Sequence, residues 1–280
     1  MLNIYYGREC IDKEKFIYET IAQAGYGPHE RTIVIVPDQY TLEAERRAFD
    51  ILGVQSLIGL DVFSLSRLGH NILAEVGGGR STFIDKYGRQ MLLTSIAREE
   101  DENLQVFRGN MAKSSFIELT NDFISEMKQY GATVDTITEI METTGKDSLL
   151  YKKLADLRLI YAKYQEKIEG KYTDSEDLID LYKDKIGQSA LIDGARIWVY
   201  GFDSFAPKSL EVLSGFMGAA EEVNVVMTYD QNCPDEDLFR LTGLVIDKLR
   251  QGAVSAGCPL GEFSRISDIS DGYSIENNAD

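Results

Sequence analysis

The sequence has few of the features of metal-binding, secreted or membrane-spanning proteins. Its three cysteines, Cys10, Cys233 and Cys258, lie far apart with no Cys-x-x-Cys or Cys/His spacing. This argues against a zinc or iron–sulfur site and fits a reducing compartment. No apolar run approaches the roughly 18 residues that a bilayer requires, and the start of the chain lacks the basic region and apolar core of a secretory signal. We therefore expect a cytoplasmic chain with no membrane partner.

Basic residues are also in short supply. The chain has 29 Lys and Arg against 46 Asp and Glu, which gives a formal net charge of −17. A domain that binds nucleic acid by bulk electrostatics is usually basic, because phosphate neutralisation supplies most of the non-specific affinity. Taken alone, this balance favours a protein-binding or small-molecule role. Any contact with DNA must be local, made by a few groups in a groove rather than by a whole basic face.

What the sequence does contain is an alternation of strands and helices towards both ends. With 280 residues and 44% hydrophobic content it can bury a sizeable core. Five apolar strands are expected, at Leu2–Tyr6, Thr32–Val36, Leu57–Phe63, Arg196–Tyr200 and Val223–Thr228. The helices that follow them are expected at Lys13–Ala24, Thr41–Leu52, Ser64–Val76, Pro207–Met217 and Asp237–Leu249. This alternation implies a parallel sheet covered on both faces. We expect the first strand and the Arg196–Tyr200 strand to be neighbours in it.

The middle of the chain has a different pattern. From about Asp85 to Lys185 the strand signal disappears and apolar residues recur at helical spacing. The predicted organisation is a discontinuous α/β core (residues 1–84 and 186–258) with an all-helical inserted domain (85–185). A polar tail (259–280), rich in Ser, Asp, Asn and Gly, is expected to be poorly ordered.

The turn after the first strand has the spacing of a phosphate-binding loop, G-x-x-x-x-G-K-[ST]. Gly7 and Lys13 occupy the first-glycine and lysine positions, whereas Asp12 replaces the second glycine and Glu14 replaces the Ser/Thr. Such a loop turns backbone N–H groups towards phosphate at the positive end of a helix, where both carboxylates are unfavourable. We predict a degenerate nucleotide site at Gly7, Arg8, Lys13 and Glu14. The simpler role of Lys13 is that of a solvated residue in a first turn capped by carboxylates.

Phosphoryl transfer at such a loop also requires metal-binding and water-positioning groups. At the end of the Arg196–Tyr200 strand, Tyr200 and Gly201 occupy the positions of an acidic pair, and Asp203 lies two residues too far along. ATP hydrolysis by this domain is therefore not expected. Phe202 and Phe205 are explained as well by packing onto the next helix as by a ligand-binding role.

Six segments, in order and with suitable gaps, resemble AddB (RexB), the B-type polypeptide of the AddAB (RexAB) helicase–nucleases. They cover most of residues 1–250 and are Val36–Glu45, Val62–Leu68, Ala74–Gly78, Phe83–Asp85, Asp174–Asp177 and Ile197–Phe205. Each segment is weak alone, but the ordered set is specific. The resemblance implies a RecA-like, P-loop NTPase-type helicase domain with a helical insertion, and a fragment of a much longer protein.

The resemblance also implies a function. In this family the partner polypeptide, AddA, drives translocation during DNA break repair and homologous recombination, and AddB is a pseudo-helicase that scans single-stranded DNA as double-stranded DNA is processed. ATP and magnesium are used at the level of the complex. A C-terminal exonuclease domain holds an iron–sulfur cluster, and neither its carboxylates nor its cysteines can be placed in this sequence. We expect no cofactor in this segment.

Carried over from the family's motifs, the DNA-binding residues fall in the P-D-Q-x-T, F-S-x-S-R and G-F-x-x-F segments. Arg and Gln make paired hydrogen bonds to base edges, and aromatic rings stack on unpaired bases. The expected set is Gln39, Thr41, Ser64, Arg67, His70 and Phe205. Leu65 stands where family members often have Phe, and His70 where they often have Trp, so stacking is expected to be weaker here.

Ordinary structural roles compete with these assignments. Gln39 and Thr41 suit a helix start, Arg67 suits an ion pair with a surface carboxylate, and His70 suits a partly buried position. Three functions therefore stay open. We favour an inactive helicase-like domain that binds single-stranded DNA and docks onto AddA. The alternatives are an active P-loop NTPase or helicase domain, and a purely structural domain that docks the partner polypeptide.

Overall fold

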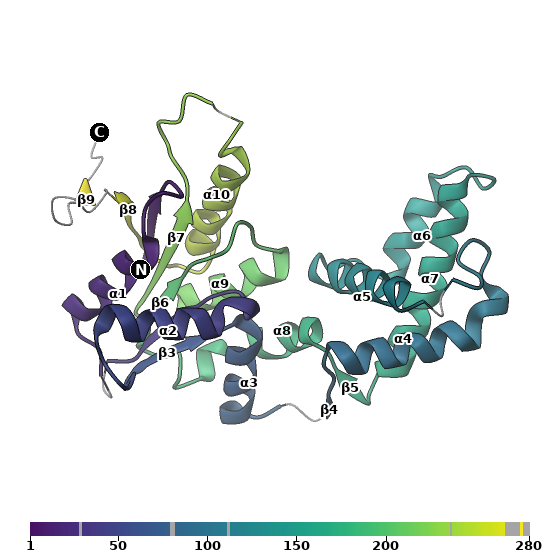
Figure 1. The fold of residues 1–280 in the computed structure, drawn as a ribbon, viewed down its shortest axis with the longest axis horizontal. Helices are drawn as coiled ribbons and strands as arrows, with labels where there is room; N and C mark the ends of the chain where they lie inside the picture. The colour runs from purple at the N-terminus through teal and green to yellow at the C-terminus, as the bar shows by residue number, and fades with distance from the viewer. Residues whose placement is uncertain (28–29, 79–81, 111–112, 236, 267–274, 277–280) are drawn as a thin grey trace. The chain divides into compact units, whose positions relative to one another are not determined.

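A computed structural model describes residues 1–27, 30–78, 82–110, 113–235, 237–266 and 275–276. The chain forms two compact units (Figure 1). The α/β unit comprises Met1–Gly77 with Leu181–Asp280, and the helical unit comprises Gly78–Asp180. The sequence pattern predicts an insertion that begins at residue 85 and ends at residue 185.

The α/β unit is built on one seven-stranded sheet in the order β3-β2-β6-β7-β1-β8-β9. Its strands are β1 (Leu2–Gly7), β2 (Thr32–Ile35), β3 (Leu60–Phe63), β6 (Arg196–Val199), β7 (Glu222–Thr228), β8 (Leu260–Ile266) and β9 (Ile275–Glu276). All neighbouring strands from β3 to β8 pair in parallel, and only β9 is antiparallel. The predicted α/β class with a RecA-like parallel sheet and a helical insertion is confirmed.

One prediction about strand order is wrong. β1 and β6 are not neighbours, because β7 lies between them and pairs with both: Val225 is opposite Ile4 on one side and Val199 on the other. The inner residues of β7, Val223 to Met227, are all buried, as expected for a strand covered on both sides. Apolar runs identify buried strands but do not fix their order.

The predicted tail also differs in part. Leu260–Ile266 form β8, which pairs with β1 and buries Ile266, so these residues complete the sheet instead of forming a poorly ordered end. Their Gly, Glu, Ser and Arg residues conceal the strand in the sequence, because part of β8 is exposed. Residues 267–274 and 277–280 of the predicted tail lie outside the described residues.

Five α-helices cover the sheet: α1 (Lys13–Ala24), α2 (Thr41–Leu52), α3 (Leu65–Val76), α9 (Pro207–Ala219) and α10 (Arg240–Ser255). Two 3₁₀ turns, η1 (Asp38–Tyr40) and η3 (Ile186–Gln188), precede α2 and follow α8. On the face under α1 and α2, the Tyr5 and Trp198 rings stack with centroids 5.7 Å apart, and Phe16 packs against both. This aromatic core ties α1 to the sheet and so fixes the first turn of α1 relative to the strand ends.

The helical unit consists mainly of α4 (Lys86–Glu100), η2 (Asp101–Asn103), α5 (Ser114–Gln129), α6 (Val134–Glu142) and α7 (Leu149–Ile168). Two-residue strands, β4 (Thr82–Phe83) and β5 (Tyr172–Thr173), pair in parallel; the sequence pattern does not predict them. Helix α8 (Ser175–Lys183) spans the division between the units. The core of the helical unit includes Leu93, Ile96, Ile117, Ile124, Ile137, Ile160 and Tyr164.

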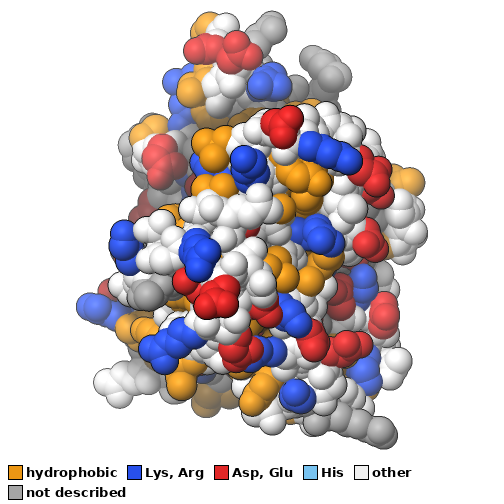
Figure 2. Space-filling view, turned by 90° about the vertical axis from the view of Figure 1, so that its right-hand side faces the viewer, with side chains coloured by type: hydrophobic (Ala, Val, Ile, Leu, Met, Phe, Trp, Pro, Cys, Tyr) orange, Lys and Arg blue, Asp and Glu red, His pale blue; other side chains and the backbone are white. Residues whose placement is uncertain are grey.

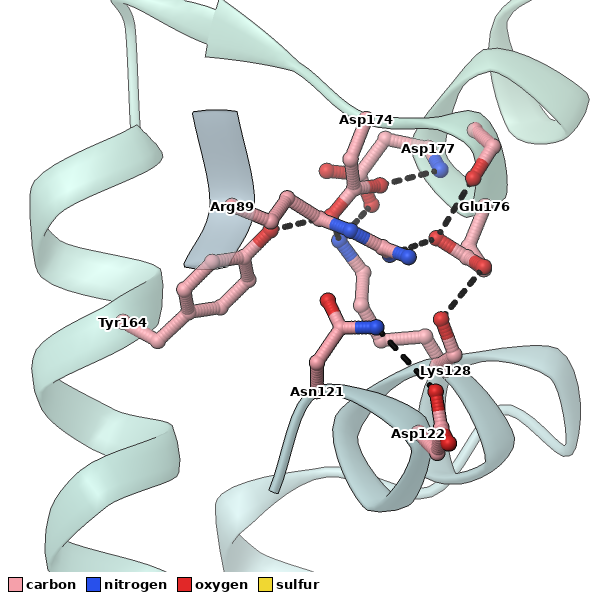
Figure 3. Close-up of polar contacts among 10 residues, drawn as sticks. Arg89, Asn121, Asp122, Lys128, Tyr164, Asp174, Glu176 and Asp177 are labelled. Carbon is pink, nitrogen blue, oxygen red and sulfur yellow. Dashed lines mark hydrogen bonds and ion pairs between the residues drawn. The ribbon is translucent and has the colours of Figure 1, made fainter. Parts of the chain in front are cut away.

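A buried polar network holds the start of α8 in the helical unit (Figure 3). Lys128 of α5 donates to Asp174 at 2.6 Å, and Arg89 of α4 donates to Glu176 at 2.6 Å. The hydroxyl of Tyr164 on α7 donates to Asp174 at 2.8 Å. Burial by itself would raise the pKa of Asp174, but the charge and hydrogen bond of Lys128 hold it below its usual value. The segment resembling the family at Asp174–Asp177 is therefore an anchoring point for three helices.

Candidate nucleic-acid interface

The carboxyl ends of β1, β2, β6 and β7 meet at one edge of the sheet, where the α/β unit has a cavity of about 520 Å³. Ligand sites of open α/β sheets lie at this edge. The cavity is lined by Glu9, Ile11, Asp12, Lys13, Glu14, Gln39, Tyr40, Tyr200, Gly201, Phe202, Asp203, Val226 and Thr228. It therefore brings together the loop after β1, the turn after β2 and the turn after β6.

The loop after β1 is held by its own side chains. Asp12 caps α1 by accepting a first-turn backbone N–H at 2.9 Å. Lys13 turns back on the loop: its Nζ donates to the carbonyl oxygen of Arg8 at 3.0 Å and lies 3.7 Å from Glu9. Arg8 itself donates to Asp230, after β7, at 2.6 Å. The lysine of the predicted phosphate loop is thus engaged by the loop it belongs to.

Arg47 of α2 neutralises the two carboxylates that replace the phosphate-loop residues. It donates to Asp12 at 2.8 Å and to Glu14 at 2.9 Å. The hydrogen bond to Glu14 is the main cause that raises the pKa of Arg47. The buried Tyr200 hydroxyl donates to Glu14 at 3.0 Å, and burial is the main cause that raises the pKa of Tyr200. Glu14 is therefore fixed by partners from α2 and from the end of β6.

These residues do not fit a triphosphate with magnesium. The lining carries four carboxylates, on Glu9, Asp12, Glu14 and Asp203, and one ammonium on Lys13, a net charge of 1 − 4 = −3. A bound triphosphate needs the opposite sign and free N–H groups at the helix start, but a carboxylate already caps α1. Tyr200, at the place of a metal-binding acid, is buried.

The turn after β2 presents the predicted DNA-binding residues Gln39 and Thr41. Gln39, in η1, is exposed and lines the cavity. The half-buried Thr41 donates its hydroxyl to the carbonyl oxygen of Asp38 at 3.2 Å, within the same turn. Between them, Tyr40 is 46% exposed and also lines the cavity. The turn therefore offers one amide and one aromatic ring to a ligand.

The turn after β3 lies beside it. Buried Ser64 caps α3 by accepting the backbone N–H of Arg67 at 3.3 Å, and Ser66 donates to Asp38 at 2.6 Å, which links the turns after β2 and β3. The side chain of Arg67 is 60% exposed and lies 3.9 Å from Glu45. His70 follows on α3 and is half-buried. Of this group, Arg67 has the most accessible polar head.

The turn after β6 does not present Phe205. Its side chain is only 8% exposed and packs on Phe202, with ring centroids 5.0 Å apart. Gly201 (φ 81°) lets this turn approach the turn after β2, because a Cβ there would lie 3.2 Å from Pro37. Phe202, not Phe205, lines the cavity.

The structure thus brings only some of the predicted residues together. Lys13, Glu14 and Gln39 line the cavity, with Gly7 and Arg8 in the adjoining loop. The other predicted residues lie outside the lining: Thr41, Ser64, Arg67, His70 and Phe205. Sequence reasoning missed Tyr40, Arg47 and the hydroxyl of Tyr200. Only Tyr40 had a visible signal, as an aromatic residue directly after Gln39 with no place in the apolar pattern.

Comparison with known proteins agrees with this fold. The family described as "ADDB, N-terminal" matches residues 4–277. Among similar proteins, each named as the B-type polypeptide of an ATP-dependent helicase/deoxyribonuclease, that of Alkaliphilus oremlandii is 31% identical, with 90% of this chain and 22% of that protein covered. That of Bacillus cereus strain B4264 is 33% identical, with 81% of this chain and 20% of that protein covered. The chain spans about a fifth of the length of these relatives, and it belongs to the ADDB N-terminal family.

Proposed function

We propose that this chain is the N-terminal pseudo-helicase region of an AddB polypeptide of an ATP-dependent helicase/deoxyribonuclease, and that it binds single-stranded DNA without hydrolysing ATP. The whole protein then works in the cytoplasm with AddA on double-stranded DNA, in break repair and homologous recombination. ATP and magnesium act elsewhere in the complex, and the nuclease and its iron–sulfur cluster lie in a C-terminal domain. The names and length of the relatives support this wider role.

One observation carries the DNA-binding part of the proposal. At the carboxyl edge of the sheet, exposed Gln39 and Arg67 follow adjacent strands, and the exposed ring of Tyr40 lies next to Gln39. Amide and guanidinium groups pair with base edges, and an aromatic ring stacks on an unpaired base. These are contacts with bases and do not require a basic surface. In this proposal Tyr40 supplies the stacking that the buried Phe205 does not.

The charge distribution limits how strong such binding is. The net charge is −17, and the face shown in Figure 2 intersperses basic, acidic and hydrophobic side chains. Among the described side chains on that face, the basic ones do not gather into a broad surface. Because phosphate contacts supply most non-specific affinity, we expect weak binding that depends on a few groups.

The test is the fluorescence anisotropy of a labelled single-stranded oligonucleotide titrated with wild-type protein and with Arg67→Ala and Gln39→Ala. A bidentate base contact is worth about 1–3 kcal/mol, so each variant is expected to bind roughly fivefold more weakly or worse. Arg31→Ala is the matched control, because exposed Arg31 immediately precedes β2, at the amino edge of the sheet. Equal effects of Arg31→Ala and Arg67→Ala would contradict the proposed site and favour the purely structural alternative.

A second measurement separates the proposal from an active P-loop NTPase. We expect no change in melting temperature when ATP and magnesium are added, because the cavity is acidic and Lys13 is bonded to its own loop. Stabilisation by ATP that disappears in Lys13→Ala would support the NTPase alternative.

A further inference from the structure

Helix α4 has apolar side chains on two faces. One face packs into the helical unit and buries Leu93, Ile96 and Ala97. On the other face Tyr87 is 74% exposed and Met91 is 75% exposed. A surface helix is normally polar opposite its buried stripe. Two large, exposed apolar residues one turn apart therefore call for a partner.

These residues border a groove of about 750 Å³ along α4. Tyr87, Met91 and Arg98 line it and recur at intervals of four and seven residues, so they share one stripe of the helix. The polar side chains between them, such as Gln90 and Thr94, also line it. Tyr, Met and Arg are among the residue types enriched in protein–protein interfaces. We call Tyr87, Met91 and Arg98 the α4 stripe.

The charges in this groove indicate the chemistry of its occupant. Glu99 is engaged: Lys167 donates to it at 2.7 Å and Ser95 at 2.6 Å, and the Lys167 hydrogen bond is the main cause that lowers its pKa. Arg98 is exposed and forms no ion pair with the residues that the structure describes. The groove thus offers one available guanidinium beside two apolar side chains, and its complement is an apolar surface that carries a carboxylate.

We propose that the α4 stripe docks an amphipathic helix of a second polypeptide, whose apolar face covers Tyr87 and Met91 and whose carboxylate pairs with Arg98. This inference rests on the proposed function, in which the chain belongs to one polypeptide of a larger enzyme. The relatives are named as the B-type polypeptide of their enzyme, which implies at least one further polypeptide. A helix laid in a groove and read at one-turn spacing is a common recognition mode.

The experiment uses full-length AddB and separately purified AddA of the same organism, with affinity measured by biolayer interferometry. Tyr87→Ser combined with Met91→Ser, and separately Arg98→Glu, are each expected to weaken association at least tenfold. Leu149→Ser combined with Leu150→Ser is the matched control: these leucines are 60% and 56% exposed on α7, outside the groove. The control is expected to leave the affinity unchanged. Recovery of the Arg98→Glu loss by an acid-to-Lys change in AddA would identify the pairing carboxylate.

Unchanged affinity in both α4-stripe variants overturns the inference. So does a lower melting temperature of isolated AddB with unchanged affinity, because it assigns the groove to a segment of the same polypeptide. Oligonucleotide binding is measured on the same proteins and is expected to be unchanged by the α4-stripe variants. Failure of the docking site therefore leaves the Arg67-dependent DNA site intact, and failure of the DNA site appears independently in Arg67→Ala.

Discussion

The two units of this protein contain ionic clusters of similar composition in very different surroundings. In the α/β unit, Arg47 joins Asp12 and Glu14 at the cavity edge, with side chains 26–45% exposed. In the helical unit, the Lys128–Asp174 and Arg89–Glu176 pairs are 0–8% exposed (Figure 3). Both clusters connect elements distant in sequence. Only the second is removed from water.

This difference separates a surface that can change from one that cannot. A solvated ion pair is worth about 0–1 kcal/mol, so charges at the cavity can be exchanged with little effect on the fold. Removing one partner of a buried pair leaves an uncompensated charge and costs about 3–5 kcal/mol. The α/β unit was therefore free to replace phosphate-binding groups by carboxylates, whereas the network around Asp174 keeps α4, α5 and α7 on the start of α8.

The largest effect is expected from Lys128→Met. The change leaves Asp174 charged and buried without its cation, so we expect the helical unit to lose about 3–5 kcal/mol of unfolding free energy. Urea denaturation followed by circular dichroism measures it. Lys86→Met is the control, because Lys86 is 53% exposed and lies 4.0 Å from Glu118. Similar losses in the two variants would remove the distinction between the clusters.

The next effect concerns pH. The folded-state pKa of Asp174 is lowered, so its contribution to stability is complete above the unfolded-state value of about 3.9 and is lost as pH falls through the folded value. Each unit of lowering corresponds to about 1.4 kcal/mol. We expect the stability of the wild-type protein to fall below about pH 4 more steeply than that of Asp174→Asn. Parallel curves from denaturation at several pH values would show that this carboxylate is not a main titrating group.

The sequence predicted the local elements better than their partners. Helix α2 was expected at Thr41–Leu52 and lies there, because its cap, apolar period and terminal glycine are local signals. The position of β7 between β1 and β6 was missed, because strand order depends on pairing between distant segments. Likewise, motif spacing identified Glu14 but not Arg47, 33 residues away. It placed Phe205 in a motif without showing that the ring is buried.

A third prediction restores the phosphate-loop residues. Asp12→Gly with Glu14→Ser changes the charge of the cavity lining from −3 to −1 and frees Arg47. We expect this variant to gain stabilisation by ATP and magnesium, which at tenfold the Kd amounts to about 1.4 kcal/mol. Thermal shift at increasing ATP measures it. Asp12→Asn with Glu14→Gln removes the same charge without the glycine, so a response confined to the first variant identifies backbone approach as the main barrier. No response in either variant would show that neither barrier alone excludes nucleotide.

The smallest effect is expected from Arg47→Met, although it breaks two hydrogen bonds of 2.8 and 2.9 Å. Asp12 and Glu14 line the cavity and remain solvated after the change, so the loss should be about 1 kcal/mol or less. Tyr200→Phe is the companion variant, since it removes only the hydroxyl that donates to Glu14. Urea denaturation in parallel with Lys128→Met places all three on one scale. If Arg47→Met costs as much as Lys128→Met, the carboxylates that replaced the phosphate loop have become part of what holds α1 and α2 together, and the exposure of the cluster does not set its energy.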